Sequence, residues 1–313
     1  MEFELSEDQQ AVAEAVEALL ARHAGAERAI ALGGKGEYDG ELERALHEAG
    51  FLALYGEAGA LPAALLVEAV AREAGVASIA ARALVAPALV ADRRFDGPIA
   101  LASVGPDGRT APARFAAHAR HVLLADGEQA KWLTLTAGEA EPVRSNFGYP
   151  LGRLPEDAHE RAVSLGAGSG ERLRRWWRTA LAIEIAGTLR SAFDVTLDYV
   201  QRRRQFGRAI GSFQGVQHRL ALAAVRVEGT RWLALEAADG GAAAEASGVA
   251  AAYAADAAKQ VFEETHQFSG AMGFTREHPL HVWSMRLQAL RLELGGVKEH
   301  RQAVARARWD AAS

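Results

Sequence analysis

The stretch RRRQFGRAIGSFQ, at residues 202–214, combines four arginines with two glutamines, two phenylalanines and two glycines. A guanidinium group offers forked N–H donors that match a diphosphate, and a glycine lets the backbone come close to a phosphate. The same arginines could instead form a hydrated helix end, because cations are stabilised at a helix C-terminus. Taken alone, this stretch leaves both interpretations open.

Two other groups of residues could support different chemistry. Residues 156–159 and 263–266 have the Glu-x-x-His spacing of di-iron helical bundles, although the first pair follows Pro155 in a loop-like stretch. Residues 174–178, RRWWR, mix cations with aromatic rings as single-strand nucleic-acid binders do. A helix start with buried tryptophans and exposed arginines explains them more simply. We therefore expect no metal site and no nucleic-acid partner.

The composition excludes several classes of protein. The net charge of −5 argues against a general nucleic-acid binder. The chain has no cysteine, which excludes disulfides, thiolate metal sites and cysteine nucleophiles. No run approaches the roughly 18 apolar residues that cross a bilayer, and the N-terminus lacks the apolar core of a signal peptide. The expectation is a cytoplasmic protein with no membrane association.

The elements that must position these residues fall into three parts. Residues 1–92 read as a helical domain, which begins with a capping box between Ser6 and Gln9. Residues 93–170 hold short apolar runs separated by turn signals, which predicts a reduced middle β-domain. Residues 171–313 repeat apolar residues at helical spacing and predict a helical bundle.

The C-terminal part should contain four long antiparallel helices, the last of them over residues 279–308. Gly207 and Gly211, with Ser212, supply the break between the first two helices. The predicted fold class is mainly α with a small β middle domain, in which a sheet or barrel-like domain separates N-terminal helices from a C-terminal four-helix bundle.

This order of elements resembles the acyl-CoA dehydrogenase family, and two motifs carry the resemblance. The family has R-x-[QT]-F-G-x-x-I-x-x-[FH]-Q followed further along by Q-x-x-G-G-x-G-[FY], and both occur here in that order, at residues 203–214 and 267–274. The resemblance implies FAD as the cofactor, an acyl-CoA thioester as substrate and electron-transfer flavoprotein as electron acceptor.

The resemblance also implies which residues contact FAD. Arg203 and Gln205 would lie against its adenosine and pyrophosphate, and Phe206 would pack at the adenine. The glutamines of both motifs would add polar contacts, and the backbone at the glycine of the second motif would approach a phosphate; Ala271 replaces a family glycine beside it. The full set is Arg203, Gln205, Phe206, Gln214, Gln267, Gly270 and Ala271.

The catalytic base that the resemblance implies is missing. The family's Glu-Gly-Thr segment, whose glutamate removes the α-proton, reads Leu294-Gly295-Gly296 here, and the alternative base position is Trp177. Glu293 is adjacent to Leu294, but one residue along a helix is about 100° of rotation, so it should point elsewhere unless the helix end is distorted. Glu184 is the other candidate, and a partly buried, ion-paired glutamate is the simpler interpretation of it.

The family's flavin contacts in the middle domain are also reduced. Only Trp132 and Thr134 can be matched to them, and Trp132 is better explained as a core aromatic of the sheet. In the family, one subunit holds the flavin end of FAD while its neighbour holds the adenosine end. This chain keeps the adenosine-side motifs and lacks much of the flavin side.

These losses are typical of a subunit that completes the FAD site of a partner. The chain resembles the shortened subunits of actinobacterial α2β2 assemblies that act on steroid side-chain acyl-CoAs, which implies a longer, base-bearing homologue as partner. Two alternatives remain open. One is a self-sufficient homo-oligomeric dehydrogenase that uses Glu293 or Glu184, and the other is a non-catalytic acyl-CoA-binding or scaffold protein.

Overall fold

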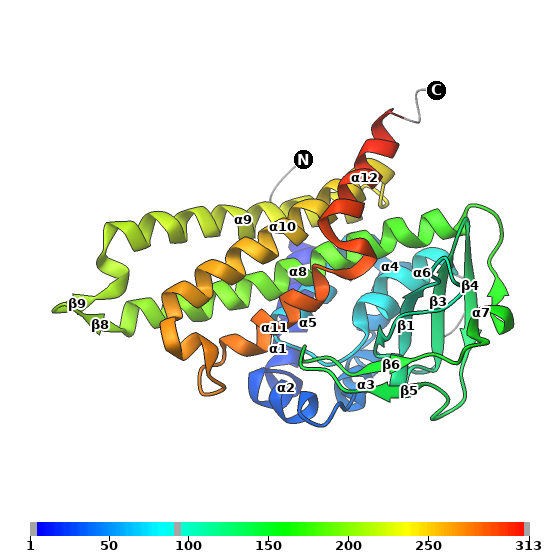
Figure 1. Cartoon of the computed structure of the whole chain (residues 1–313), viewed down its shortest axis with the longest axis horizontal. Helices are drawn as coiled ribbons and strands as arrows, with labels where there is room; N and C mark the ends of the chain where they lie inside the picture. The colour runs from blue at the N-terminus through cyan, green and yellow to red at the C-terminus, as the bar shows by residue number, and fades with distance from the viewer. Residues whose placement is uncertain (1–4, 91–94, 310–313) are drawn as a thin grey trace.

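The computed structural model describes residues 5–90 and 95–309, and Figure 1 shows their arrangement. Helices come first, a group of short strands follows, and long helices complete the chain. The predicted fold class is therefore confirmed: the protein is mainly α, with a small β part between an N-terminal helical region and a C-terminal helical bundle.

The N-terminal helices begin with the predicted capping box. The Gln9 backbone N–H donates to the Ser6 hydroxyl (3.3 Å), and the Ser6 N–H donates to the Gln9 side chain (3.0 Å). Gly50 ends the third helix region in a left-handed conformation (φ 81°), which glycine adopts without steric cost. The elements are α1 Glu7–His23, α2 Ala26–Gly33, α3 Gly40–Glu48, η1 Phe51–Ala53, α4 Leu54–Ala58, α5 Ala60–Arg72, the π-helix η2 Ala80–Val85 and α6 Ala86–Leu89.

Two small sheets form the middle of the chain, at the N-terminal end of the longest helix (Figure 1). The four-stranded sheet has the order β1-β3-β4-β7, with β1 parallel to β3 and the other pairs antiparallel. The three-stranded sheet has the order β2-β6-β5. The strands are β1 Ile99–Ser103, β2 Ala113–Arg114, β3 His121–Asp126, β4 Gln129–Thr134, β5 Glu141–Val143, β6 Leu151–Arg153 and β7 Val163–Ser164, with η3 Ala116–His118 and α7 Ala158–Arg161 between them.

Long helices make up the rest of the described chain. Their bounds are α8 Ser169–Arg202, α9 Gln214–Asp239, α10 Ala244–Ser269, α11 Leu280–Leu290 and α12 Gly296–Trp309, with η4 Ile210–Ser212, η5 Gly270–Phe274 and η6 Glu293–Gly295 between them. The first break falls where it was predicted and is a two-stranded hairpin, β8 Arg204–Gln205 and β9 Arg208–Ala209.

The prediction of one continuous helix over residues 279–308 is wrong. The chain turns between α11 and α12 because Leu294, Gly295 and Gly296 all have positive φ, at 51°, 84° and 66°. The two glycines adopt this conformation without the steric penalty that a side chain brings, so the helical pattern of apolar residues on either side does not continue through them.

The N-terminal helices and the long helices share one hydrophobic core. They approach closely at Gly187 on α8, where an added Cβ would lie 2.2 Å from the backbone oxygen of Glu68 on α5. On α8, Trp176 and Trp177 are buried as predicted. Arg178 was predicted to be exposed but is buried as well. Within residues 5–90 and 95–309, no helix has both the length and the apolar character needed to span a bilayer.

Candidate functional site

Both candidate bases lie in the interior, and both are bound to one arginine. Arg114, at the end of β2, donates from its two terminal nitrogens to the carboxylate of Glu184 on α8, at 2.9 and 2.7 Å. Arg114 also forms an ion pair with Glu293 of η6 through Nε. The indole N–H of Trp177 donates to the other oxygen of Glu293 at 2.9 Å. We call these four residues the Arg114 cluster.

The inward direction of Glu293 corrects the expectation from a regular helix. Because the backbone reverses at Leu294 (φ 51°), Glu293 does not follow the 100° progression of an α-helix and instead reaches the interior. Its side chain is 18% exposed, and the side chains of Arg114 and Glu184 are 12% and 10% exposed. The interpretation of Glu184 as a partly buried, ion-paired glutamate agrees with these contacts.

Electrostatics in the Arg114 cluster favour the charged form of Arg114. Burial lowers the pKa of Arg114, but the carboxylates of Glu184 and Glu293 outweigh this and hold it well above its usual value. The ring of Tyr149 lies between two guanidinium groups, 4.8 Å from that of Arg114 and 4.7 Å from that of Arg286. A carboxylate whose oxygens already accept from a guanidinium or an indole is a poor acceptor for a substrate proton.

The space beside the Arg114 cluster is small. The cavity has a volume of about 20 Å³ and is lined by Ser78, Ala80, Ala81, Ile99, Leu101, Arg114, Phe115, Glu184 and Glu293. A single water molecule needs roughly 10–15 Å³ of such volume. This cavity therefore has room for water but not for a flavin ring or an acyl chain.

The two residues matched to flavin contacts in the middle domain are engaged with the sheet instead. Trp132 on β4 is buried, and its ring lies 4.8 Å from the ring of His121 on the neighbouring strand and 5.7 Å from Phe95. The hydroxyl of Thr134 lies 3.3 Å from Nδ1 of His121. The environment of Trp132 is that of a sheet-core aromatic.

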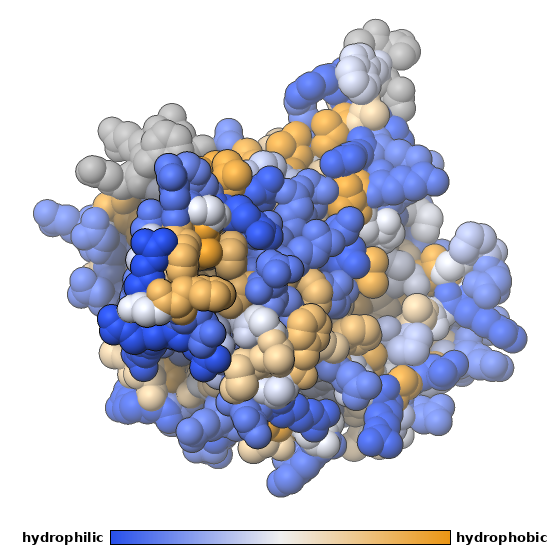
Figure 2. Space-filling view, turned by 60° about the vertical axis from the view of Figure 1, so that its left-hand side comes forward, coloured by the Kyte–Doolittle hydropathy of each residue, from blue (hydrophilic) through white to orange (hydrophobic). Residues whose placement is uncertain are grey.

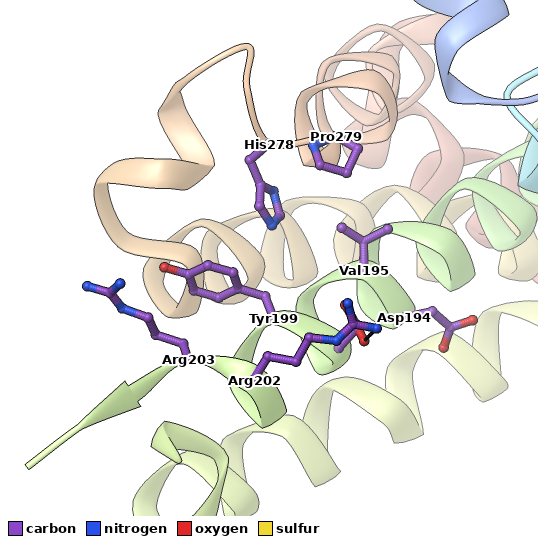
Figure 3. A pocket seen from close by; sticks show the side chains of 8 residues that line it. Asp194, Val195, Tyr199, Arg202, Arg203, His278 and Pro279 are labelled. Carbon is purple, nitrogen blue, oxygen red and sulfur yellow. Dashed lines mark ion pairs between the residues drawn. The ribbon is translucent and has the colours of Figure 1, made fainter. Parts of the chain in front are cut away.

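The adenosine-side residues lie at the opposite end of α8. Arg203 follows the last residue of α8, and its backbone carbonyl accepts from the N–H of Ile210 (2.8 Å), which holds the hairpin in place. Figure 3 shows Arg203 beside Tyr199 and His278 at a pocket of about 650 Å³. Arg202 is also exposed and also lines this pocket, but its guanidinium is paired with Asp198 at 2.6 Å, so the hydrated-helix-end interpretation applies to Arg202.

The hairpin presents an aromatic ring to solvent. Phe206 is 91% exposed, and its backbone has a positive φ of 53°. Its ring lies 6.2 Å from that of Phe213, over which the guanidinium of Arg208 packs at 4.0 Å. Figure 2 brings this end of the molecule forward and shows apolar areas framed by charged side chains.

The second motif lies at the same end of the bundle. Arg219 near the start of α9 pairs with Glu264 (2.8 Å) and packs over the ring of Phe268 (4.9 Å), which joins the beginning of α9 to the end of α10. Gly270 caps α10 with a φ of 55°, a conformation that disfavours side chains. Every member of the predicted FAD set other than Arg203, Phe206 and Gly270 is likewise exposed: Gln205, Gln214, Gln267 and Ala271. The exposed donors and backbone at this end fit the adenosine and diphosphate part of FAD.

Comparison with known sequences identifies the C-terminal part of the chain. Residues 172–308 match the family model described as acyl-CoA dehydrogenase, C-terminal domain. Acyl-CoA dehydrogenase FadE34 of Mycobacterium tuberculosis is 36% identical over 186 residues, which cover 56% of this chain and 26% of that protein. The 3-sulfinopropanoyl-CoA desulfinase of Paraburkholderia xenovorans is 38% identical over 106 residues, 33% of this chain and 27% of the relative. The chain thus spans about a quarter of the length of these relatives.

Solved structures show the same fold along the whole chain. The ChsE4-ChsE5 complex from Mycobacterium tuberculosis contains a chain with a TM-score of 0.80 at 20% identity, covering 98% of both chains. The Tcur3481-Tcur3483 steroid ACAD gives a TM-score of 0.80 at 23% identity, covering 98% of this chain and 99% of that one. Butyryl-CoA dehydrogenase from Megasphaera elsdenii gives 0.78 at 18% identity, with coverage of 98% and 99%. Residues 172–308 therefore match the C-terminal domain of acyl-CoA dehydrogenases, and the chain as a whole has the fold of these solved structures.

Proposed function

We propose that this chain is a subunit of an FAD-dependent acyl-CoA dehydrogenase that completes the FAD site of a partner subunit and has no working base of its own. The observation that carries the proposal is the Arg114 cluster, in which both candidate bases are bound to one guanidinium beside a cavity of about 20 Å³. The exposed residues of the two motifs at the other end of α8 support the part of the proposal that concerns the partner's FAD site.

In the proposed reaction a base removes the α-proton of an acyl-CoA thioester, and bound FAD supplies the acceptor for the hydride that leaves the β-carbon. The residues of this chain bind and orient the far end of that cofactor. The Arg203 guanidinium offers forked donors to the diphosphate, Phe206 offers an open aromatic ring, and the amides of Gln205 and Gln267 offer further polar contacts. The base comes from the partner.

The partner that we propose is a longer homologue with a glutamate at the base position, assembled as α2β2. The structural similarity to chains from the ChsE4-ChsE5 complex and the Tcur3481-Tcur3483 steroid ACAD supports a heteromeric assembly and a bulky, steroid-type acyl group as substrate class. The fold of this chain is also similar, with a TM-score of 0.81, to a chain in the structure of the electron transferring flavoprotein of Acidaminococcus fermentans. This similarity supports electron-transfer flavoprotein as the electron acceptor.

The test of catalysis compares glutamate variants in the assembled complex. Glu184→Gln and Glu293→Gln in this chain keep the size of the side chain and an acceptor for Arg114 and Trp177, so the rate should stay within roughly twofold of the wild-type complex. Replacing the partner's base glutamate with glutamine should lower the rate at least roughly 100-fold. A rate from the isolated chain that Glu293→Gln abolishes would establish a self-sufficient homomer instead.

The test of the cofactor end compares two neighbouring arginines. Arg203→Ala removes a forked cation and should weaken FAD binding by the complex roughly 10- to 100-fold, the value of a charge-assisted contact of about 1.5–3 kcal/mol. Arg202→Ala is the matched control, because Arg202 is exposed and already paired with Asp198. Equal FAD affinity in the two variants would contradict the assignment of Arg203.

A further inference from the structure

A third hollow, separate from the Arg114 cavity and from the pocket at Arg203, lies between α2, the loop that joins β5 to β6, and α11. Its volume is about 840 Å³, within the range of small-molecule binding sites. The end of α2, residues 142–151, residues 274–276 and the first turns of α11 line it. None of the predicted FAD residues lines this hollow, which we call the α2–α11 cleft.

No carboxylate side chain of the described residues lines the α2–α11 cleft. The charged side chains of its lining are therefore all basic. The charged and titratable groups that line it, apart from the tyrosine at its floor, are Lys35, Arg144, Arg276, His281 and Arg286. Arg144 and Arg276 are exposed, and no carboxylate of residues 5–90 or 95–309 lies within ion-pair distance of either. A basic cleft on a chain of net charge −5 is a local concentration of positive charge that favours an anion.

The floor of the cleft adds a buried positive charge. Arg286 is 1% exposed and donates to the backbone carbonyls of Gly75 (3.1 Å) and Gly148 (3.3 Å), while its Nε has no hydrogen-bond partner among the described residues. Burial lowers the pKa of Arg286, and Tyr149 and Glu184 offset only part of the loss of hydration. An anion in the cleft would add further counter-charge to this guanidinium.

The rim of the cleft offers an aromatic surface. Phe274 is 77% exposed; one contact of its ring is with His266, at 4.8 Å between centroids. Apolar side chains such as Val143, Val282 and Met285 continue the lining below it. An open aromatic ring beside arginines is the combination that stacks a planar base while cations bind its phosphates.

We propose that the α2–α11 cleft binds a nucleoside diphosphate moiety, with the phosphates at Arg144 and Arg276 and the base against Phe274. Two molecules of the proposed function carry this moiety, FAD and coenzyme A, and a free nucleotide carries it as well. The choice between FAD and coenzyme A rests on the proposed function, whereas the binding of the diphosphate itself does not.

The experiment is a calorimetric titration of the full-length chain with ADP. We expect saturable binding at one site per chain, weakened at least roughly tenfold by the double change Arg144→Gln and Arg276→Gln. Arg153→Gln on β6 is the matched control: it is an exposed arginine outside the cleft lining, and ADP affinity should not change. Because the two cleft arginines are exposed, the double variant should keep the wild-type thermal midpoint.

Competition identifies the carrier. Displacement of ADP by FAD or by coenzyme A, with an affinity that the double variant lowers, assigns the cleft to that molecule; ADP that neither displaces indicates a free nucleotide. Absence of saturable ADP binding up to millimolar concentration overturns the proposal, as does an equal loss of ADP affinity in Arg153→Gln. If ADP binding fails while the partner complex turns over as described above, only the cleft assignment falls.

Discussion

Arg114 forms ion pairs with two carboxylates, Glu184 and Glu293, that are 109 positions apart in the chain (293 − 184). Its charge therefore contributes to the stability of the folded state. Two anions with one cation leave a formal excess of negative charge in a mostly buried place. Removing the cation from such a group leaves unpaired charge away from water, which is far more costly than never having had the group.

Arg114→Met should therefore lower the free energy of unfolding by about 3–5 kcal/mol, measured by urea denaturation at neutral pH. The triple variant Arg114→Met, Glu184→Gln and Glu293→Gln removes all three charges and should recover much of that loss. Arg153→Met, at an exposed position on β6, is the control and should change the free energy by less than about 0.5 kcal/mol. A single variant as stable as the control would show that the Arg114 cluster does not act as a coupled group.

At the scale of elements, α8 is the helix against which the others pack, and small residues set how closely they approach. Gly187 allows the backbone of α5 to lie where a side chain would otherwise be, with a virtual Cβ at 2.2 Å from Glu68 O and 3.0 Å from Arg72 N. The ion pair of Glu68 with Arg231 (2.7 Å) then ties α5 to α9 as well. A change at Gly187 thus affects three helices.

Gly187→Ala should destabilise the protein by about 1–3 kcal/mol, because overpacking outweighs the gain of up to about 1 kcal/mol from the better helix propensity of alanine. Gly215→Ala, in the first turn of α9 with nothing within 4 Å of its virtual Cβ, isolates the propensity effect and should be neutral or stabilising. The two thermal midpoints should move apart; a shift in the same direction for both variants would rule out the close approach of α5 and α8 as the cause.

The docking of α12 on α10 depends on an uncharged histidine. His300 is fully buried, neither of its ring nitrogens has a hydrogen-bond partner among the described residues, and burial, with Arg178 nearby, lowers its pKa to about 4. In the unfolded chain its pKa is 6.5, so the unfolded state takes up a proton as the pH falls through 6.5 while the folded state does not. Stability from this group is complete above that pH and decreases towards pH 4.

Between pH 7.5 and pH 5, His300 alone should lower the free energy of unfolding by about 2 kcal/mol. His300→Leu should make the pH dependence shallower by that amount, whereas His47→Leu, at an exposed position, should leave it unchanged. Burial also lowers the pKa of His266 and His278, so some acid sensitivity should persist in the His300 variant. Parallel stability curves for wild type and His300→Leu would contradict this account.

At the scale of the whole molecule, the sequence predicts helices and caps, which depend on local patterns. It does not predict contacts between segments that are far apart in the chain. Helix periodicity located α8 and α10, and Ser6 with Gln9 located the start of α1, because those signals lie within a few residues of each other. The inward turn of Glu293 depends on the conformation of Leu294 and two glycines inside an otherwise helical pattern. The pairing of Arg114 with Glu184 and Glu293 joins residues 70 and 179 positions apart, which no local signal reports.

The hairpin tip described above has the geometry of a two-residue turn whose central residues, Phe206 and Gly207, both have positive φ (53° and 79°). Such turns favour Asn-Gly, and a bulky residue in the first central position is strained by about 1–3 kcal/mol. Phe206→Asn should therefore raise the thermal midpoint of the isolated chain and, at the same time, weaken FAD retention by the assembled complex. A higher thermal midpoint together with weaker FAD retention would mean that Phe206 lowers the stability of the subunit but contributes to FAD binding in the complex. A Phe206→Asn complex that keeps its FAD would show that the exposed ring does not contribute to FAD binding.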